Sequence, residues 1–205
     1  MKYPYLEFDP QDFDSLYNTE RNENQLIKFL LFGIFVAGKN SKVTAKRLDN
    51  LFYFAPTDIL KNPAQWLMDM GEERFKWVCK QSGLGCYNQR WKSVVSLNEW
   101  LKTNSLQYAS LGQILEIKGV GNKTARFFIL FSRPYARFAV VDTHILKEIN
   151  SIYGTDFTLT GSNKQYKMLE MLWLDYIEPD TPPEQNDFYA RADFNGWIKH
   201  VKVGS

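Results

Sequence analysis

The chain has 205 residues, of which 44% are hydrophobic, 16% aromatic and 23% charged, and its formal net charge at pH 7 is +2. This composition is typical of a soluble globular protein and excludes a wholly disordered chain, a collagen-like repeat and a disulfide scaffold. The length suits either one large domain or two small lobes.

The first half of the chain is predicted to be helical. Helices are expected over 10–18, 23–37 and 40–53, from Asn62-Pro63 onward, near 72–80 and over 87–103, with Thr57 as the cap of a further short helix. The apolar run 26–37 has 12 residues, including Lys28, whereas a membrane-spanning helix needs about 20. It therefore indicates a buried helix, and no membrane association is expected.

Cysteine usage bears on the compartment. Cys79 and Cys86 are too few for a disulfide framework or a four-cysteine cluster. Together with a start that carries no apolar signal core, they predict a reducing compartment, the cytoplasm or, in a eukaryote, the nucleus.

The second half continues the helical pattern. Ser110 is expected to cap a helix that stops at Gly119-Val120-Gly121, and a second, mostly apolar helix follows from 122 to 131. A short apolar stretch at 138–141 leads to Asp142, a candidate cap for a helix over 143–149. A helix over 163–177, a Pro-rich loop over 179–186 and an aromatic-rich segment over 187–202 complete the chain.

Basic residues gather in two segments, 33–50 and 110–149, whereas 170–195 is acidic. The second basic segment contains Lys118, Lys123, Arg126, Arg133, Arg137 and Lys147. Such segments could follow a phosphate backbone. The alternative is an ordinary solvated surface.

The segment Gly119-Val120-Gly121 joins two predicted helices. Two glycines permit a tight turn and a close approach of another backbone, and the free amides of the following helix suit a phosphate oxygen. The alternative is a plain helix–helix turn. The pattern is not a dinucleotide fingerprint, because Thr124 stands at the third glycine position and no strand clearly precedes it, and it is not a Walker loop.

Lys123 and Asp142 are the candidate reactive pair. Lys123 lies in the first turn after the glycines, and Asp142 follows 19 residues later at the head of another helix. A lysine beside an apolar wall can have a lowered pKa and act as a nucleophile, with a carboxylate to accept its proton. The alternatives are a solvated lysine and an aspartate that only caps its helix.

The segment Ile117-Lys118-Gly119-Val120-Gly121-Asn122-Lys123-Thr124-Ala125, followed by Val140-Val141-Asp142-Thr143-His144-Ile145, resembles the helix-hairpin-helix, Gly/Pro/Asp superfamily of DNA glycosylases. The resemblance implies that the hairpin residues Gly119, Val120 and Gly121 bind a DNA phosphate. It also implies that Lys123 attacks the sugar C1′ of a flipped nucleotide, that Asp142 is the catalytic aspartate, and that the strand is nicked by β-elimination.

The chain departs from part of this superfamily. Endonuclease III and adenine glycosylases carry a four-cysteine iron–sulfur loop after the aspartate helix, but this chain has no cysteine beyond Cys86. We therefore expect no cluster, no metal and no cofactor. A short, clusterless chain with a lysine in the hairpin is similar to the compact 8-oxoguanine glycosylases.

Other roles implied by the resemblance concern DNA contacts. Residues after the first long helix fill the space left by the flipped base, which points to Lys39, Asn40 and Ser41, with a solvated loop as the alternative. Three aromatics are candidates for stacking on the extruded base, with core packing as the alternative: Phe188, Tyr189 and Trp197. Lys199, His200 and Lys202 contact DNA or form a polar tail, and His144 is expected to be structural.

The expected architecture is all-α, with two helical lobes and a DNA-binding cleft between them. One lobe spans 22–133 and contains the helix-hairpin-helix (110–131), and the other joins 1–21 to 134–205 and carries Asp142. The expected protein is a monomeric glycosylase and AP lyase of base excision repair, whose partner is duplex DNA with an oxidised base, foremost 8-oxoguanine. The alternatives are the same chemistry on an oxidised pyrimidine, a mismatched base or a modified base, and a non-catalytic helix-hairpin-helix module.

Overall fold

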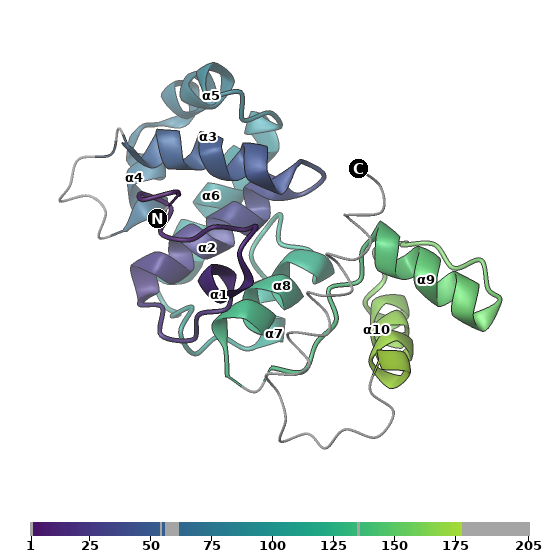
Figure 1. Ribbon diagram of the computed structural model, residues 1–205. Coiled ribbons are helices and arrows are strands. Elements are labelled where there is room, and N and C mark those ends of the chain that lie inside the picture. The colour runs from purple at the N-terminus through teal and green to yellow at the C-terminus, as the bar shows by residue number, and fades with distance from the viewer. Residues whose placement is uncertain (1, 54, 56–61, 135, 178–205) are drawn as a thin grey trace. The chain divides into compact units, whose positions relative to one another are not determined.

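A computed structural model describes residues 2–53, 55, 62–134 and 136–177 of the chain, and within these residues the helices are joined by turns and loops, without a strand (Figure 1). The prediction of an all-α protein is confirmed. Contacts between residues divide the chain into two compact units, 1–120 and 121–205.

The helices of the first unit are α1 (Phe13–Leu16), α2 (Glu23–Val36), α3 (Ser41–Tyr53), α4 (Pro63–Asp69), α5 (Glu72–Gln81), α6 (Tyr87–Leu101) and α7 (Leu111–Leu115). Those of the second unit are α8 (Asn122–Ser132), α9 (Thr143–Tyr153) and α10 (Asn163–Ile177). The lobe boundaries expected from the sequence differ from this division and stay a prediction.

The core of the first unit forms around α2. All residues from Leu26 to Phe35 are buried, and α2 contacts α3, α4 and α6, which are drawn above it in Figure 1. Lys28 lies within this buried run because its amine pairs with the Glu7 carboxylate. Burial of a helix on all sides explains why its sequence shows little polar patterning.

The second unit has a core of its own, made where α9 packs against α10. Val141, Ile145 and Ile149 meet Leu169 and Trp173 there. This packing holds the segment that leads into α9 against α10, and it thereby positions Asp142 at the head of α9.

Several helices differ in length from the expectation. The helix capped by Ser110 ends at Leu115, before the glycines, and the helix expected over 87–103 ends at Leu101. Two further differences have a clear local cause. The helix expected over 10–18 is limited to α1, because the Asp9 and Asp12 side chains accept hydrogen bonds from the amides of Gln11 and Asp14 and stabilise turns instead. The helix expected to end at residue 149 continues to Tyr153. It ends where Gly154, with φ +60°, adopts the left-handed conformation that closes many helices.

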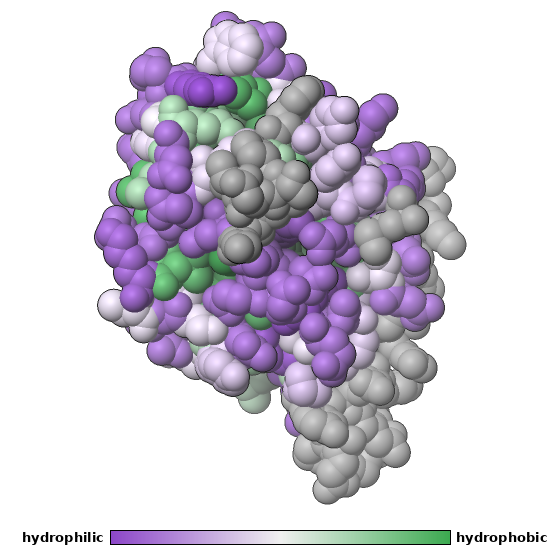
Figure 2. Space-filling model, turned by 90° about the vertical axis from the view of Figure 1, so that its left-hand side faces the viewer, coloured by the Kyte–Doolittle hydropathy of each residue, from purple (hydrophilic) through white to green (hydrophobic). Residues whose placement is uncertain are grey.

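The molecular face in Figure 2 is mainly hydrophilic, with small hydrophobic areas between polar side chains. Within the described ranges, no helix is both long enough and apolar enough to cross a bilayer.

The two cysteines lie in different environments, and this difference predicts selective alkylation. Cys79 is buried, and desolvation raises the pKa of its thiol to about 12, whereas Cys86 is exposed at the start of α6. Because the thiolate is the nucleophile, iodoacetamide at pH 8 should add one group to the native protein. Intact-mass analysis should show this single adduct and lose it in Cys86→Ser; two adducts on the folded protein would contradict the burial of Cys79.

Candidate active site

Asp142 is the N-cap of α9. Its Oδ1 accepts hydrogen bonds from the backbone amides of His144, at 2.9 Å, and Ile145, at 3.1 Å, and the residue is buried. Asp142 thus satisfies two of the free amides at the start of the helix. Asp142 therefore does cap its helix, as one of the two interpretations of the sequence held. The cap uses only one of the two carboxylate oxygens.

The other oxygen of Asp142 faces Lys123. The Lys123 Nζ lies 3.5 Å from Asp142 Oδ2, and the Lys123 side chain is 54% exposed whereas that of Asp142 is 7% exposed. Lys123 occupies the first turn of α8, so the two residues come from the starts of two different helices of the same unit. The structure brings the two candidate catalytic residues together.

This pair combines an accessible amine with a fixed carboxylate. A partly exposed ion pair adds little to stability, about 0–1 kcal/mol, so stability does not explain the arrangement. An amine open to solvent can attack an electrophilic carbon, and a carboxylate at hydrogen-bonding range can accept its proton and stabilise positive charge. The site is therefore equipped for nucleophilic catalysis by an amine.

The hairpin turn before α8 is held by one hydrogen bond within the turn and one to α6. The amide of Val120 donates to the carbonyl of Ile117 at 3.0 Å, and the amide of Lys118 donates to Ser96 Oγ at 2.9 Å. Gly119 has φ +87°, and a Cβ there would lie 2.0 Å from Ser93 Oγ of α6. Only glycine fits this position, for both its backbone conformation and its packing.

The hydrogen bond of Val120 modifies the expected phosphate site. Val120 is buried and its amide belongs to the turn, so it does not face outward as the sequence suggested. Within the described part of the chain, the amides of Gly119 and Gly121 meet no acceptor, and Gly121 precedes α8 without a side-chain cap. Gly119 and Gly121 stay candidates for the phosphate contact expected from the sequence.

The two hairpin glycines should respond differently to alanine. Gly119→Ala should destabilise the protein by about 2 kcal/mol or more, which lowers Tm by about 4–8 °C, because of its positive φ and its contact with Ser93. A Cβ on Gly121 meets nothing within 4 Å, so Gly121→Ala should fold normally. It should still weaken duplex DNA binding by about tenfold if a phosphate approaches that amide, since a tenfold change is about 1.4 kcal/mol.

Thermal denaturation and fluorescence anisotropy with a labelled duplex measure the two effects. Equal Tm values for both variants would contradict the turn geometry. Wild-type DNA affinity in Gly121→Ala would contradict a phosphate contact at that position.

Lys39 and Asn40 lie between α2 and α3, and Ser41 is the first residue of α3. The Asn40 side chain accepts a hydrogen bond from the amide of Val43, at 3.0 Å, and Ser41 Oγ accepts one from the Gln11 side chain, at 2.9 Å. Lys39 and Asn40 are exposed. Asn40 and Ser41 therefore organise the start of α3, and insertion of this loop into DNA stays a prediction.

The base-pocket candidates Phe188, Tyr189 and Trp197 lie outside the described residues, as do Lys199, His200 and Lys202. In the part of the chain that is described, no three side chains of His, Cys, Asp or Glu lie close enough together to form a metal site.

A cavity of about 360 Å³ in the first unit borders the hairpin. Lys118 and Gly119 of the turn line it together with Lys92 and Ser93 of α6. The exposed lysines place positive charge beside the Gly119 amide, which favours an anionic ligand at this turn.

Sequence reasoning missed an ion pair in the second unit. Arg126, counted there among the basic residues of a surface segment, is 1% exposed, and its Nε lies 2.9 Å from both carboxylate oxygens of Glu170. A count of charges along a segment does not show which side of a helix a residue occupies. One signal could have indicated the burial of Arg126. Arg126 lies four residues after Asn122 and on the same helix face as the buried Ile129.

Comparisons with known proteins found no matching family model and no matching curated protein. Two solved structures do share the fold. The 8-oxoguanine glycosylase/lyase of Methanocaldococcus jannaschii, in complex with a 15mer DNA containing 8-oxoguanine, has a TM-score of 0.67 and 16% identity over 95% of this chain and 89% of that one.

The 8-oxoguanine DNA glycosylase of Thermotoga maritima has a TM-score of 0.62 and 19% identity over 94% of this chain and 90% of that one. Both alignments extend over nearly the full length of the chain, including both of its units. The chain therefore has the fold of these archaeal and bacterial 8-oxoguanine DNA glycosylases.

Proposed function

We propose that this protein is a DNA glycosylase with AP lyase activity that removes an oxidised base, foremost 8-oxoguanine, from duplex DNA. The observation that carries the proposal is the 3.5 Å separation between Lys123 Nζ and Asp142 Oδ2, directly after a glycine hairpin. The fold shared with two 8-oxoguanine glycosylases supports it. A module that only binds DNA has no need for both residues.

The proposed reaction begins with a flipped nucleotide, because a base inside a duplex is out of reach. The lone pair of the unprotonated Lys123 amine forms a bond to the sugar C1′. At the same time the bond from C1′ to the base breaks, and the base leaves with the two electrons of that broken bond. Asp142 Oδ2 accepts a proton from the attacking nitrogen and stabilises positive charge on the sugar.

The adduct then opens to a Schiff base as the bond between C1′ and the ring oxygen breaks. Loss of a proton from C2′ expels the 3′ phosphate, and this β-elimination nicks the strand on the 3′ side of the lesion. Hydrolysis of the Schiff base releases Lys123. These reaction steps balance with protons and water alone, and they require no metal or organic cofactor.

The proposed DNA contacts come from residues in both units of the chain. The amides of Gly119 and Gly121 bind a phosphate near the lesion, which positions the duplex without reading its sequence. The loop with Lys39, Asn40 and Ser41 fills the vacated space, and Phe188, Tyr189 and Trp197 remain the proposed base pocket. The proposed partner is a damaged duplex, bound by a monomer.

Borohydride trapping on a panel of duplexes tests this function. Each duplex carries 8-oxoguanine, an oxidised pyrimidine, a mismatched base or a modified base, and an undamaged duplex is the control. We expect a covalent adduct and a 3′ nick with the 8-oxoguanine duplex. An adduct with another lesion alone would overturn the substrate, and DNA binding without any adduct or base release would favour a non-catalytic module.

A further inference from the structure

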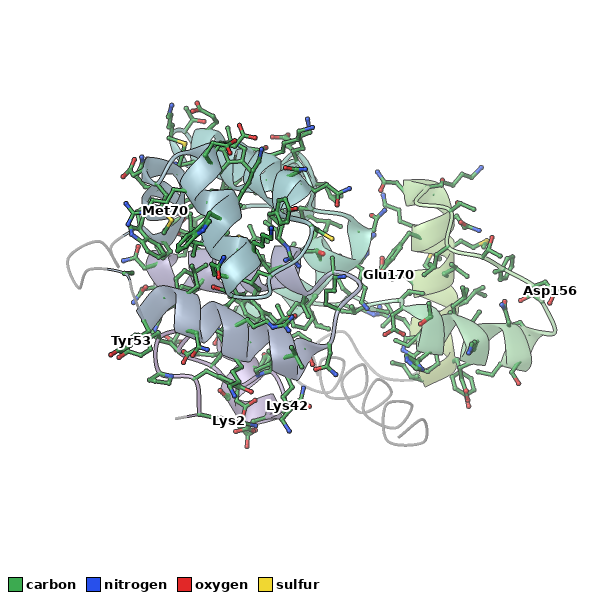
Figure 3. The ribbon with its side chains drawn as sticks, turned by 90° about the horizontal axis from the view of Figure 1, so that it is seen from above. Lys2, Lys42, Tyr53, Met70, Asp156 and Glu170 are labelled. Atoms are coloured by element: carbon green, nitrogen blue, oxygen red, sulfur yellow. The ribbon has the colours of Figure 1, made fainter. Side chains whose placement is uncertain are left out.

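One buried carboxylate connects the two segments that carry Lys123 and Asp142. Glu170 Oε1 accepts hydrogen bonds from Arg126 Nε of α8, at 2.9 Å, and from the backbone amide of Ala139, at 3.0 Å. Arg126 lies one turn beyond Lys123, and Ala139 lies three residues before Asp142. Glu170, labelled on α10 in Figure 3, thus bonds to both sides of the reactive pair.

Further contacts extend this link toward both residues. Arg126 Nη1 donates to Asn122 Oδ1 at 2.8 Å, next to Lys123 in the chain. Tyr166 Oη, one turn before Glu170, lies 3.3 Å from the carbonyl of Val141, next to Asp142. The Arg126 guanidinium also lies over the Tyr166 ring, 4.5 Å from its centroid. The network therefore reaches from the neighbour of Lys123 to the neighbour of Asp142.

Stability does not account for this network. The Arg126 and Glu170 side chains are 1% and 10% exposed, and desolvation raises the pKa of Glu170 although the Arg126 charge and the Ala139 amide oppose the shift. Taking two charges out of water is costly, and a well-packed apolar pair of similar volume is often equally stable or more so. What an apolar pair would lack is the set of directional bonds to Ala139 and Asn122.

We propose that Glu170 is a positioning residue, which keeps the Asp142 carboxylate within hydrogen-bonding range of the Lys123 amine by bonding to both of their segments. The inference rests on the proposed function. Displacement of a reacting group by about 1 Å can cost about a hundredfold in rate, so loosening either segment should slow the chemical step.

The first test is Glu170→Gln, which keeps the size of the side chain but replaces one acceptor oxygen with a donor. With a preformed abasic-site duplex, the single-turnover rate of adduct formation should fall by about tenfold to a hundredfold. The dissociation constant for the same duplex should change by less than about twofold, because no phosphate contact is altered. A lower rate with unchanged affinity indicates a positioning role, whereas a general loss of structure would lower both.

Two further variants complete the test. Arg126→Met/Glu170→Met replaces the ion pair with apolar side chains and should fold even if Glu170→Gln does not. Its single-turnover rate of adduct formation should fall as in Glu170→Gln. Lys28→Met is the matched control, because it removes the buried ion pair with Glu7 in the first unit and should lower Tm without changing the rate. Wild-type rates in both Glu170 variants, or rate and affinity that fall together, would make Glu170 a structural residue only.

If the wild-type chain forms no adduct with any duplex, the proposed function fails. The role of Glu170 in positioning Lys123 and Asp142 can then be tested by NMR of lysines that are reductively methylated with ¹³C. The Lys123 resonance, identified by its loss in Lys123→Gln, should shift in Asp142→Asn. It should shift in the same direction in Glu170→Gln. An unchanged Lys123 resonance in Glu170→Gln would overturn the inference.

Discussion

Replacement of Lys123 with glutamine is expected to abolish covalent capture of DNA and strand nicking, with a fall in rate of at least about a thousandfold. Glutamine has a similar length but no nucleophilic amine, so neither the bond to C1′ nor the Schiff base can form. The Lys123 side chain is half exposed, and its removal should leave the fold and the affinity for duplex DNA nearly unchanged. Gel analysis of borohydride-treated reactions measures the adduct and the nick together.

Lys164→Gln is the matched control for Lys123→Gln. Lys164 is an exposed lysine at the start of α10, in the same unit, and the variant should react at the wild-type rate. Retained adduct formation in Lys123→Gln would contradict the assignment of the nucleophile.

Replacement of Asp142 with asparagine is expected to separate the two roles of this residue. Asparagine caps helices about as well as aspartate, so the hydrogen bonds to the amides of His144 and Ile145 should persist and Tm should change by less than about 2 °C. The atom that faces Lys123 can, however, no longer accept a proton. The rate of adduct formation should fall by about a hundredfold to ten-thousandfold, the usual contribution of general acid–base catalysis.

Asp142→Ala is the comparison for this prediction. It removes the cap as well as the proton acceptor, so it should lose both activity and about 1 kcal/mol of stability. A wild-type rate in Asp142→Asn would mean that Asp142 is a helix cap and takes no part in the chemistry.

The features that the sequence predicted depend on signals close together in the chain. Ser110 and Gln113 form a capping box at α7, Asp142 caps α9, and the helix expected over 163–177 has those bounds in the structure. At α7 and α9 the capping residues are neighbours of the first turn. The approach of Lys123 to Asp142 was expected because a buried helix and a turn separate them.

The features that the sequence did not predict depend on distant packing or on backbone angles. Arg126 and Glu170 are 44 residues apart, and their burial arises only when α10 packs beside the segment before Asp142. The hydrogen bond of the Val120 amide follows from the exact form of the turn at Gly119; the two glycines predict a turn there but not which amide it uses. Local periodicity contains no information on either.

The proposed reaction depends on a covalent bond between the amine of Lys123 and the deoxyribose of a damaged nucleotide. The most direct measurement is peptide mapping by mass spectrometry of the borohydride-reduced adduct with an 8-oxoguanine duplex. The sugar remnant should be attached to the peptide that contains Lys123, at that side chain. Attachment at another amine, or base release without any reducible adduct, would contradict it.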